Sequence, residues 1–174
     1  MININIRTDK FWKKYKMNNI SIWYKGYTYS HSIKQIIEIC TNIRKDEISS
    51  FVKKIDGHFS LVVKRDDLTF IAVDKINSVQ LFFIKIKDNF FIDSDPKRLV
   101  KLNKFHKKID KNAKLELSMS GFTIGNKTIY KNLYSLKAGE IVLFKKNNYE
   151  YLHYYKYFGD LVDKSFDEYL KELS

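Results

Sequence analysis

The most regular pattern of apolar and polar positions lies between residues 56 and 100. Four apolar blocks of strand length, at 59–63, 68–73, 81–86 and 90–92, alternate there with charged turns. The blocks are rich in β-branched and aromatic residues, which suit a half-buried, pleated surface. Asp95 and Pro96 follow, and an aspartate before a proline is typical of a helix start. This stretch therefore predicts four strands in two hairpins, followed by a short helix.

The first 30 residues also have the pattern of strands. Residues 1–6 alternate with a period of two, and a second strand-like run covers 20–29. Between them lies a basic, aromatic stretch at 11–16. We interpret this stretch as an amphipathic surface, and stacking against a nucleic acid is the alternative.

Two helices are predicted between these strands and the central blocks. Ser32 and Gln35 have the spacing of a capping box, and the apolar residues that follow share one face with Cys40. A second helix is predicted to begin at Asp46, and Gly57 ends it. Cys40 is then a small, buried apolar residue rather than a reactive thiol.

The C-terminal half is less regular. The segment 101–108 is basic and has no clear period, whereas 110–117 fits a short helix. A hairpin is predicted across 146–148. The last residues, 161–174, have a capping box and one apolar face, so we expect a tail helix there.

Composition places the chain among globular proteins. It has 174 residues, of which 44% are hydrophobic and 16% aromatic, enough for one domain with a substantial core. The net charge of +12 suggests a nucleic-acid partner, but only four of the 32 basic residues are arginine. Arginine is the usual side chain for recognising phosphates and bases. The composition therefore argues against nucleic acid and leaves open a basic surface that docks an acidic partner.

No apolar run is long enough to span a bilayer, and residues 1–7 lack the apolar block of a signal peptide. The single cysteine excludes an internal disulfide and favours a reducing, cytoplasmic compartment. The four histidines are isolated along the sequence, so no metal site is predicted.

Three motifs in the central stretch carry a family resemblance. They are Gly-His-Phe-Ser at 57–60, Val-Asp through Gln-Leu-Phe at 73–82, and Asp-Ser-Asp-Pro-Lys-Arg-Leu at 93–99. Their order and spacing resemble the N-terminal glutaminase domain of asparagine synthetases and their relatives, a class II glutamine amidotransferase domain with the fold of N-terminal-nucleophile (Ntn) hydrolases. That family has Arg-Asp-x-x-Gly-x-x-Pro-Leu-Tyr in the second motif. Here Val73 replaces its arginine, Ser78 its glycine and Gln80 its proline.

The glycines extend the resemblance beyond the central stretch. Five of the six fall where the family uses glycine: Gly26, Gly57, Gly121, Gly125 and Gly139. Glycine tends to mark a positive φ or a close backbone approach. The resemblance therefore implies that these turns keep the geometry of the family, and ordinary turns are the alternative.

The residues that carry glutaminase chemistry in the family are not matched. The resemblance implies a cysteine nucleophile directly after the initiator methionine, with its own α-amine as base. That position is Ile2, whose alkyl side chain cannot attack an amide. The family's Asn-Gly oxyanion hole corresponds to Lys25 and Gly26, so only the glycine remains. The Arg-Gly segment that holds the substrate carboxylate has no counterpart, so we expect no catalytic residue and no glutaminase activity.

The fold expected from the resemblance is α+β, a reduced αββα sandwich of two antiparallel sheets with outer helices. Residues 1–160 would form a degenerate glutaminase-like domain. Its implied function is to support an asparagine-synthetase-type, ATP-dependent, amide-forming ligase without hydrolysing glutamine, as in β-lactam synthetases and lasso-peptide cyclases. One alternative is a free-standing binding or regulatory module with no ligase partner. The other is an active glutamine hydrolase, against which Ile2 argues.

The tail at 161–174 would open, or link to, an ATP-dependent synthetase domain or subunit. The chain would then be a piece of a longer protein or a half-protein that needs a partner. ATP and Mg²⁺ are expected only in that synthetase, so no cofactor is expected in this domain. Four apolar residues on one face of the tail helix are predicted to dock with it: Phe166, Tyr169, Leu170 and Leu173. The alternative is that this apolar stripe folds back onto the sheet of its own domain.

Overall fold

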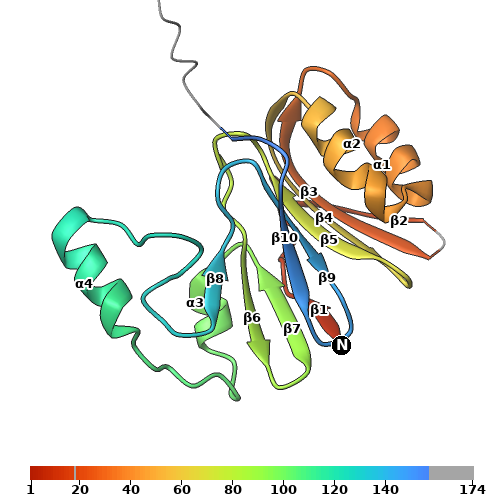
Figure 1. Cartoon of the computed structure of the whole chain (residues 1–174). Coiled ribbons are helices and arrows are strands. Elements are labelled where there is room, and N and C mark those ends of the chain that lie inside the picture. Colours follow the sequence, from red (N-terminus) through yellow and green to blue (C-terminus); the bar gives the residue numbers. More distant parts are fainter. Residues whose placement is uncertain (18, 157–174) are drawn as a thin grey trace, which may run out of the picture.

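Two β-sheets packed against each other form the centre of this computed structural model, which describes residues 1–17 and 19–156. One sheet has the strand order β10-β9-β5-β4-β3-β2, and the other has the order β1-β7-β6-β8. Within the two sheets only the pair β1 and β7 is parallel. Figure 1 shows the two sheets and the helices outside them. The expected α+β sandwich is confirmed.

Most elements follow the order predicted from the sequence, and the strands β2 and β8 were not predicted. The strands of the six-stranded sheet are β2 (Lys13–Met17), β3 (Ile20–Thr28), β4 (Gly57–Arg65), β5 (Thr69–Val73), β9 (Glu140–Phe144) and β10 (Tyr149–His153). Those of the four-stranded sheet are β1 (Ile2–Ile4), β6 (Phe82–Ile86), β7 (Asn89–Asp93) and β8 (Leu133–Ser135). The helices are α1 (Ile33–Asn42), α2 (Ile48–Lys54), α3 (Pro96–Val100) and α4 (Lys111–Ser120), with a short 3₁₀ turn, η1 (Lys45–Glu47), before α2.

The two predicted central hairpins enter different sheets. β4 pairs with β5 in the six-stranded sheet, whereas β6 pairs with β7 in the four-stranded sheet. The segment 74–81 therefore crosses from one sheet to the other. The apolar blocks on both sides of this crossover are buried because each contributes to the space between the sheets.

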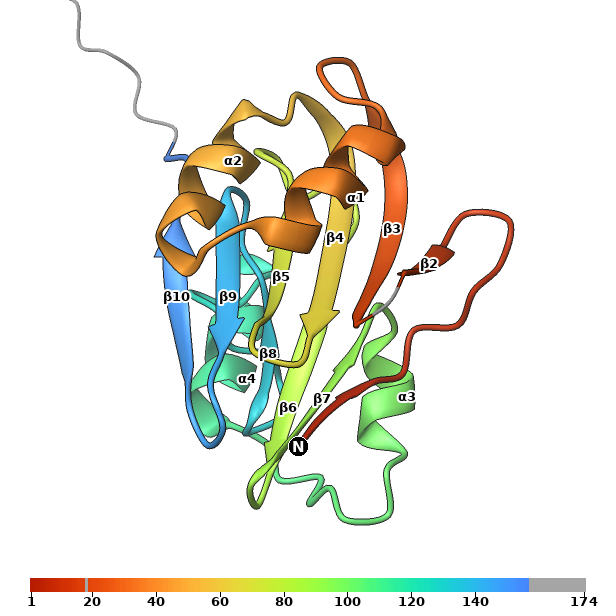
Figure 2. The same ribbon diagram turned by 90° about the vertical axis from the view of Figure 1, so that its right-hand side faces the viewer.

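The alternation of residues along the strands separates two cores. Ile22 and Leu61 point to the face that α1 and α2 cover, and they belong to the cluster that contains Cys40. Their neighbours Trp23 and Val62 point to the other face and belong to the cluster between the sheets. Figure 2 shows α1 and α2 lying across the six-stranded sheet.

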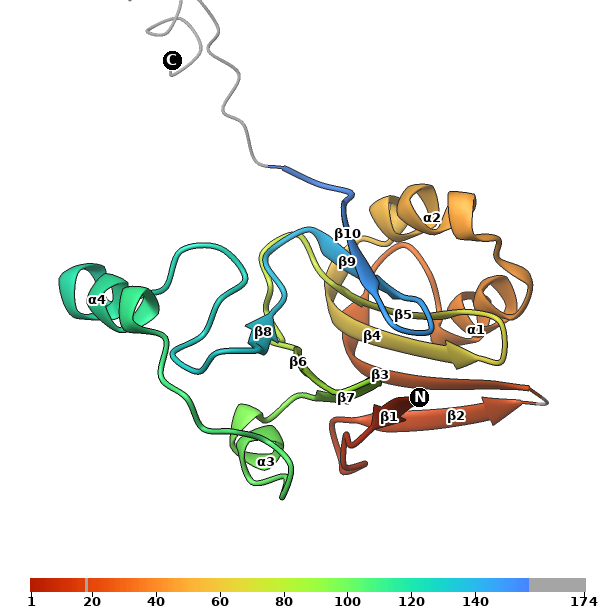
Figure 3. The same cartoon turned by 60° about the horizontal axis from the view of Figure 1, so that its bottom comes forward.

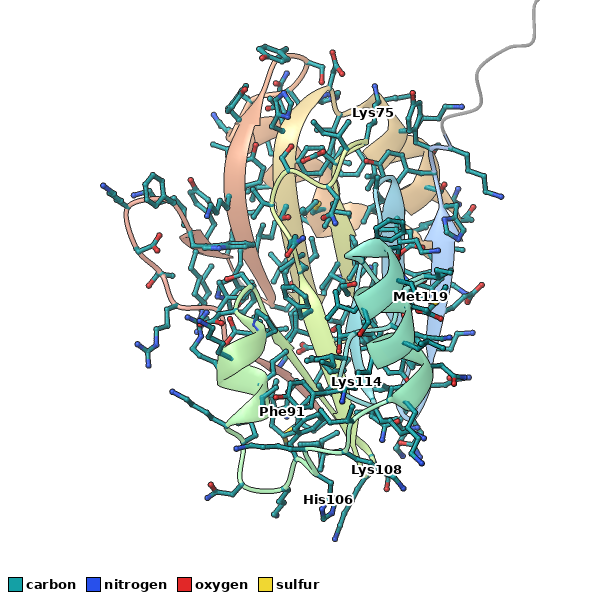
Figure 4. The ribbon with its side chains drawn as sticks, turned by 90° about the vertical axis from the view of Figure 1, so that its left-hand side faces the viewer. Lys75, Phe91, His106, Lys108, Lys114 and Met119 are labelled. Atoms are coloured by element: carbon teal, nitrogen blue, oxygen red, sulfur yellow. The ribbon has the colours of Figure 1, made fainter. Side chains whose placement is uncertain are left out.

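The outer face of the four-stranded sheet has a thinner helical layer. α3 begins at its N-cap Asp95, as predicted, and its buried residue Leu99 packs with Phe82 and Ile84 of β6. α4 buries only Ala113. The helix extends away from the sheets in Figure 1, and Figure 4 shows Lys114 and Met119 on it. The sandwich is thus reduced on this side.

Three boundaries differ from the predictions. β1 covers three residues instead of 1–6. The basic stretch at 11–16 contains a strand, β2, whose residues are mostly exposed because it lies at the sheet edge. α2 begins at Ile48 rather than at Asp46, because the chain first makes the 3₁₀ turn at Lys45–Glu47.

The predicted tail helix at 161–174 lies outside the described residues. So do the end of the predicted domain at residue 160 and the docking residues Phe166, Tyr169, Leu170 and Leu173. Within the described part of the chain, no helix has both the length and the apolar character needed to cross a bilayer.

Candidate functional site

Two glycines bring β3 and β4 unusually close together. Gly26 has a φ of +122° and Gly57 a φ of +144°. A Cβ atom on Gly26 would lie 1.9 Å from the carbonyl oxygen of His58, and one on Gly57 would lie 2.3 Å from that of Tyr27. Both positions therefore require glycine, for its backbone freedom and for the lack of space. The predicted positive φ at these two positions is confirmed.

A cleft of about 780 Å³ opens beside Gly26. It lies between the loop before β2, the ends of β3 and β4, and the start of α1. Its lining contains three lysines, two histidines and several aromatic rings, but no carboxylate. The residues that give the cleft its chemical character are Lys10, Phe11, Lys13, Lys25, His31 and His58.

Lysines gather around one aromatic ring in this cleft. The Lys10 Nζ lies 4.8 Å from the centroid of the Phe11 ring, and the Lys25 Nζ lies 5.4 Å from it. Such cation–π contacts favour these positions for the ammonium groups. Neither lysine forms an ion pair with a carboxylate in the described part of the chain.

Asp9 fixes the loop that carries Lys10 and Phe11. Its carboxylate accepts hydrogen bonds from the backbone N–H groups of Phe11 (2.7 Å) and Trp12 (2.6 Å). The bonds from Trp12 and Phe11, together with the nearby Lys25, lower the pKa of Asp9 below its usual value. The loop is thus held at the rim of the cleft by a charged side chain.

A buried aspartate organises the crossover next to the cleft. The carboxylate of Asp74 is 1% exposed and accepts hydrogen bonds from the backbone N–H groups of Phe59 (3.0 Å), Ile76 (2.8 Å) and Ser78 (3.1 Å). These bonds tie the start of β4 to the turn that leaves β5. Asp74 keeps the aspartate of the second family motif, and its role here is structural.

The same turn corrects one assignment made from the sequence. Ser78 was expected to replace the glycine of the second motif. The residue with a left-handed backbone in this turn is instead Asn77, with a φ of 57°. Two residues separate the aspartate from the glycine in the family motif, which also places the glycine at Asn77. Asparagine tolerates this conformation better than most residues because its short side chain can hydrogen-bond locally.

A histidine and a serine contact each other in the cleft, and sequence reasoning did not find them. The Nδ1 atom of His58 lies 2.8 Å from the Oγ atom of Ser78. A serine nucleophile needs a base that is itself oriented by a third group. Within the described residues no carboxylate bonds to His58, whose ring instead packs 5.3 Å from that of Tyr27. The pair therefore lacks the third member of a catalytic triad.

The structure does not bring the expected nucleophile position to this cleft. Ile2 pairs with Phe90 in the four-stranded sheet, and its carbonyl accepts a hydrogen bond of 2.8 Å from the Lys64 Nζ. Gly26 pairs with Phe59, at the other end of β4. Phe59 and Lys64 are separated by roughly 17 Å along the strand. Ile2 and the Lys25–Gly26 pair therefore lie near opposite ends of β4.

The single cysteine lies on the buried face of α1. Cys40 is fully buried in the core between α1, α2 and the six-stranded sheet, as predicted. Burial raises the pKa of its thiol to about 12. Because the thiolate is the reactive form, Cys40 is inert as a nucleophile near neutral pH.

The chain is similar to one sequence family and to a solved structure. The model of the family described as "Glutamine amidotransferase domain" matches residues 36–156. Among solved structures, the chain is similar to the glutamine phosphoribosylpyrophosphate amidotransferase of B. subtilis in complex with ADP and GMP, with a TM-score of 0.45 and 11% identity. The similarity covers 80% of this chain and 30% of that protein's length. A comparison with curated proteins gave no match.

Proposed function

Because this chain belongs to the glutamine amidotransferase domain family, we propose that it is an amidotransferase-like domain without glutaminase activity that supports an ATP-dependent, amide-forming ligase. The observation that carries the loss of activity is the burial of the only thiol in the chain. Class II amidotransferases attack glutamine with a cysteine, as the resemblance described above implies. A fully buried thiol with a raised pKa cannot perform that attack.

Two further features support the loss of glutaminase activity. Ile2 stands at the position expected for the nucleophile, and it lies away from the cleft that contains Gly26. Lys25 stands where the family has the asparagine of its oxyanion hole. Losing one oxyanion donor costs on the order of 3 kcal/mol of transition-state stabilisation. Restoring a thiol alone would therefore leave the reaction slow.

The ligase part of the proposal rests on the three central motifs, whose order resembles that of asparagine synthetases. In such a pair, a separate synthetase domain or subunit would hold ATP and Mg²⁺ and activate a carboxylate. This domain would supply a folded platform beside it. The acceptor would then be an amine or an intramolecular group, because no ammonia would come from glutamine.

An ammonia-release assay tests the loss of activity. The purified chain is incubated with glutamine, and ammonia and glutamate are measured beside a blank and an active class II glutaminase. We expect the blank rate from this chain. We also expect it from the variant Ile2→Cys, because Lys25 still occupies the oxyanion position. Ammonia release that grows with protein concentration and disappears after heat denaturation would contradict the proposal.

A second experiment tests the partnership with a ligase. The coding sequence after Ser174 and the neighbouring genes are searched for a Ser-Gly-Gly-x-Asp-Ser pyrophosphate loop, and the encoded synthetase is produced with and without this chain. We expect ATP-dependent amide formation only when both are present. Full ligase activity without the chain would contradict the supporting role.

A free-standing binding module is the second candidate function. It is favoured by the cleft beside Gly26, whose lysines face no carboxylate in the cleft lining. The absence of a synthetase gene nearby would favour this module over the ligase-supporting domain.

A further inference from the structure

β2, the strand at one end of the six-stranded sheet, has a free edge. β2 pairs with β3 from Lys13 opposite Tyr24 to Met17 opposite Ile20, and with no other strand in the described part of the chain. An unpaired strand edge presents backbone N–H and C=O groups that can bind a further strand. Figure 2 shows β2 beyond β3, at the margin of the sheet.

Basic side chains lie on both faces of this strand. Lys13 and Tyr15 line the cleft beside Gly26. Lys14 and Lys16 line a second cleft of about 730 Å³. This distribution follows from the period of two along a strand, which sends successive side chains to opposite faces. An added strand would therefore meet lysines whichever way its side chains point.

Segments next to β2 add to this positive charge. Lys10 and Lys25 line the first cleft, and Lys64 lines the second. None of these lysines, nor the three on β2, forms an ion pair with a carboxylate in the described residues. The second cleft contains one carboxylate, Asp66, and the first contains none.

Edge strands often carry lysines simply to prevent unwanted pairing between molecules. That role needs charges on the strand itself. It does not account for Lys10, Lys25 and Lys64, which come from neighbouring segments and line the same two clefts. We propose that the free edge of β2 binds an extended, carboxylate-rich segment of a partner protein as a seventh strand of the sheet. Backbone hydrogen bonds would supply affinity, and the lysines on both faces would select acidic side chains.

The distribution of arginines favours a peptide over a nucleic acid. Three of the four arginines form ion pairs within the domain, namely Arg44, Arg65 and Arg98. Arg65 also donates to the carbonyls of Cys40, Thr41 and Ile43 at the end of α1. The lining of the first cleft contains no arginine, and the arginine in the lining of the second, Arg65, is already engaged by these partners. An ion-paired arginine is less available to phosphates or bases.

This binding surface does not depend on the proposed function. β2 has the same free edge whether or not the domain lacks glutaminase activity and supports a ligase.

The test uses the full chain and a fluorescein-labelled peptide of alternating glutamate and threonine, with binding followed by fluorescence anisotropy at low salt. We expect saturable binding that weakens as salt is added. The matched peptide with lysine in place of glutamate should not bind. Equal binding of both peptides, or of neither, would overturn the proposal.

A second peptide tests for strand addition directly. It has the same sequence and charge, but alternate backbone nitrogens are methylated so that they cannot donate to β2. We expect its affinity to fall by about tenfold or more, because several backbone hydrogen bonds are lost at once. Unchanged affinity would show that the peptide is held by charge alone and would overturn the seventh strand.

Charge reversal on the chain locates the site. Lys13→Glu combined with Lys16→Glu changes one lysine on each face of β2, and should weaken binding by about tenfold. The control is Lys111→Glu combined with Lys114→Glu on α4, which lies at the opposite end of the molecule from β2 in Figure 3. Equal losses in both variants would overturn the assignment to β2. If the β2 variant does not fold, Lys13→Gln with Lys16→Gln replaces it.

Two other occupants are distinguished by the same assay. An oligouridylate of equal charge that binds more tightly than the acidic peptide would identify a nucleic-acid surface and overturn the proposal.

The variant Asp167→Asn with Glu168→Gln removes two carboxylates from the chain's own C-terminal segment. We expect the peptide affinity to stay the same. An increase would show that this segment competes for the edge, and would overturn the choice of a partner protein.

Discussion

Replacing glycine by alanine distinguishes two roles that glycine plays in this chain, which are to avoid a steric clash and to allow a positive φ. A Cβ atom at Gly57 would lie 2.3 Å from the carbonyl oxygen of Tyr27, whereas one at Gly121 would meet no atom within 4 Å. Both residues have a positive φ, at +144° and +77°. The backbone strain of an alanine is thus present at both positions, and the collision only at Gly57.

We therefore expect Gly57→Ala to destabilise the fold by roughly 3 kcal/mol and Gly121→Ala by roughly 1 kcal/mol. Denaturant unfolding of the two variants measures the difference. Equal losses would show that the approach of β3 to β4 can relax without cost.

The thiol of Cys40 provides a second prediction at this scale. Burial raises its pKa from 9.0 to about 12, so the folded state holds the proton more tightly than the unfolded state does. The stability that this proton contributes is present below pH 9 and is lost as the pH rises towards 12. At pH 8 iodoacetamide should therefore not modify Cys40 in the native chain, and should modify it quickly in denaturant. Rapid modification under native conditions would contradict the burial.

Helices α1 and α4 have the same length, but only α1 packs closely against a sheet. Ile36 of α1 is fully buried over the six-stranded sheet, whereas Met119 of α4 is 79% exposed. We expect Ile36→Ala to cost roughly 2–4 kcal/mol, because it leaves a cavity, and Met119→Ala to change stability by less than about 0.5 kcal/mol. Thermal unfolding of both variants measures this. A large loss from Met119→Ala would show that α4 packs against another part of the molecule.

Most strands and helices could be predicted from the sequence because their signals are local. Apolar runs of strand length predicted β3 and β4, and the spacing of Ser32 and Gln35 predicted the start of α1, where both capping-box bonds form. β2 was missed because an edge strand buries little, so its residues show no apolar alternation. The glycine of the second motif was assigned one position late, at Ser78, although the spacing of the motif places it at Asn77.

The cleft beside Gly26 could not be predicted in the same way, because it is assembled by long-range contacts. It joins the loop at Lys10 to the turn at Ser78, which the pairing of β3 with β4 brings together. In the sequence these lysines were indistinguishable from a general excess of positive charge. Lys25 and Gly26 were found through the resemblance alone. The docking role of Phe166, Tyr169, Leu170 and Leu173 stays a prediction.

The parallel pairing of β1 with β7 has a consequence for the order in which the molecule assembles. It joins Ile2 to Phe90 across about half of the chain, with only three residues in the strand. Closing so long a loop costs conformational entropy, and three residue pairs contribute little stability to offset that cost. β1 should therefore attach late and detach first, by a local opening that leaves β4 intact. In native-state hydrogen exchange, we expect the amide of Asn3 to exchange far faster than that of Val62. Equal protection at both would show that β1 unfolds only with the whole domain.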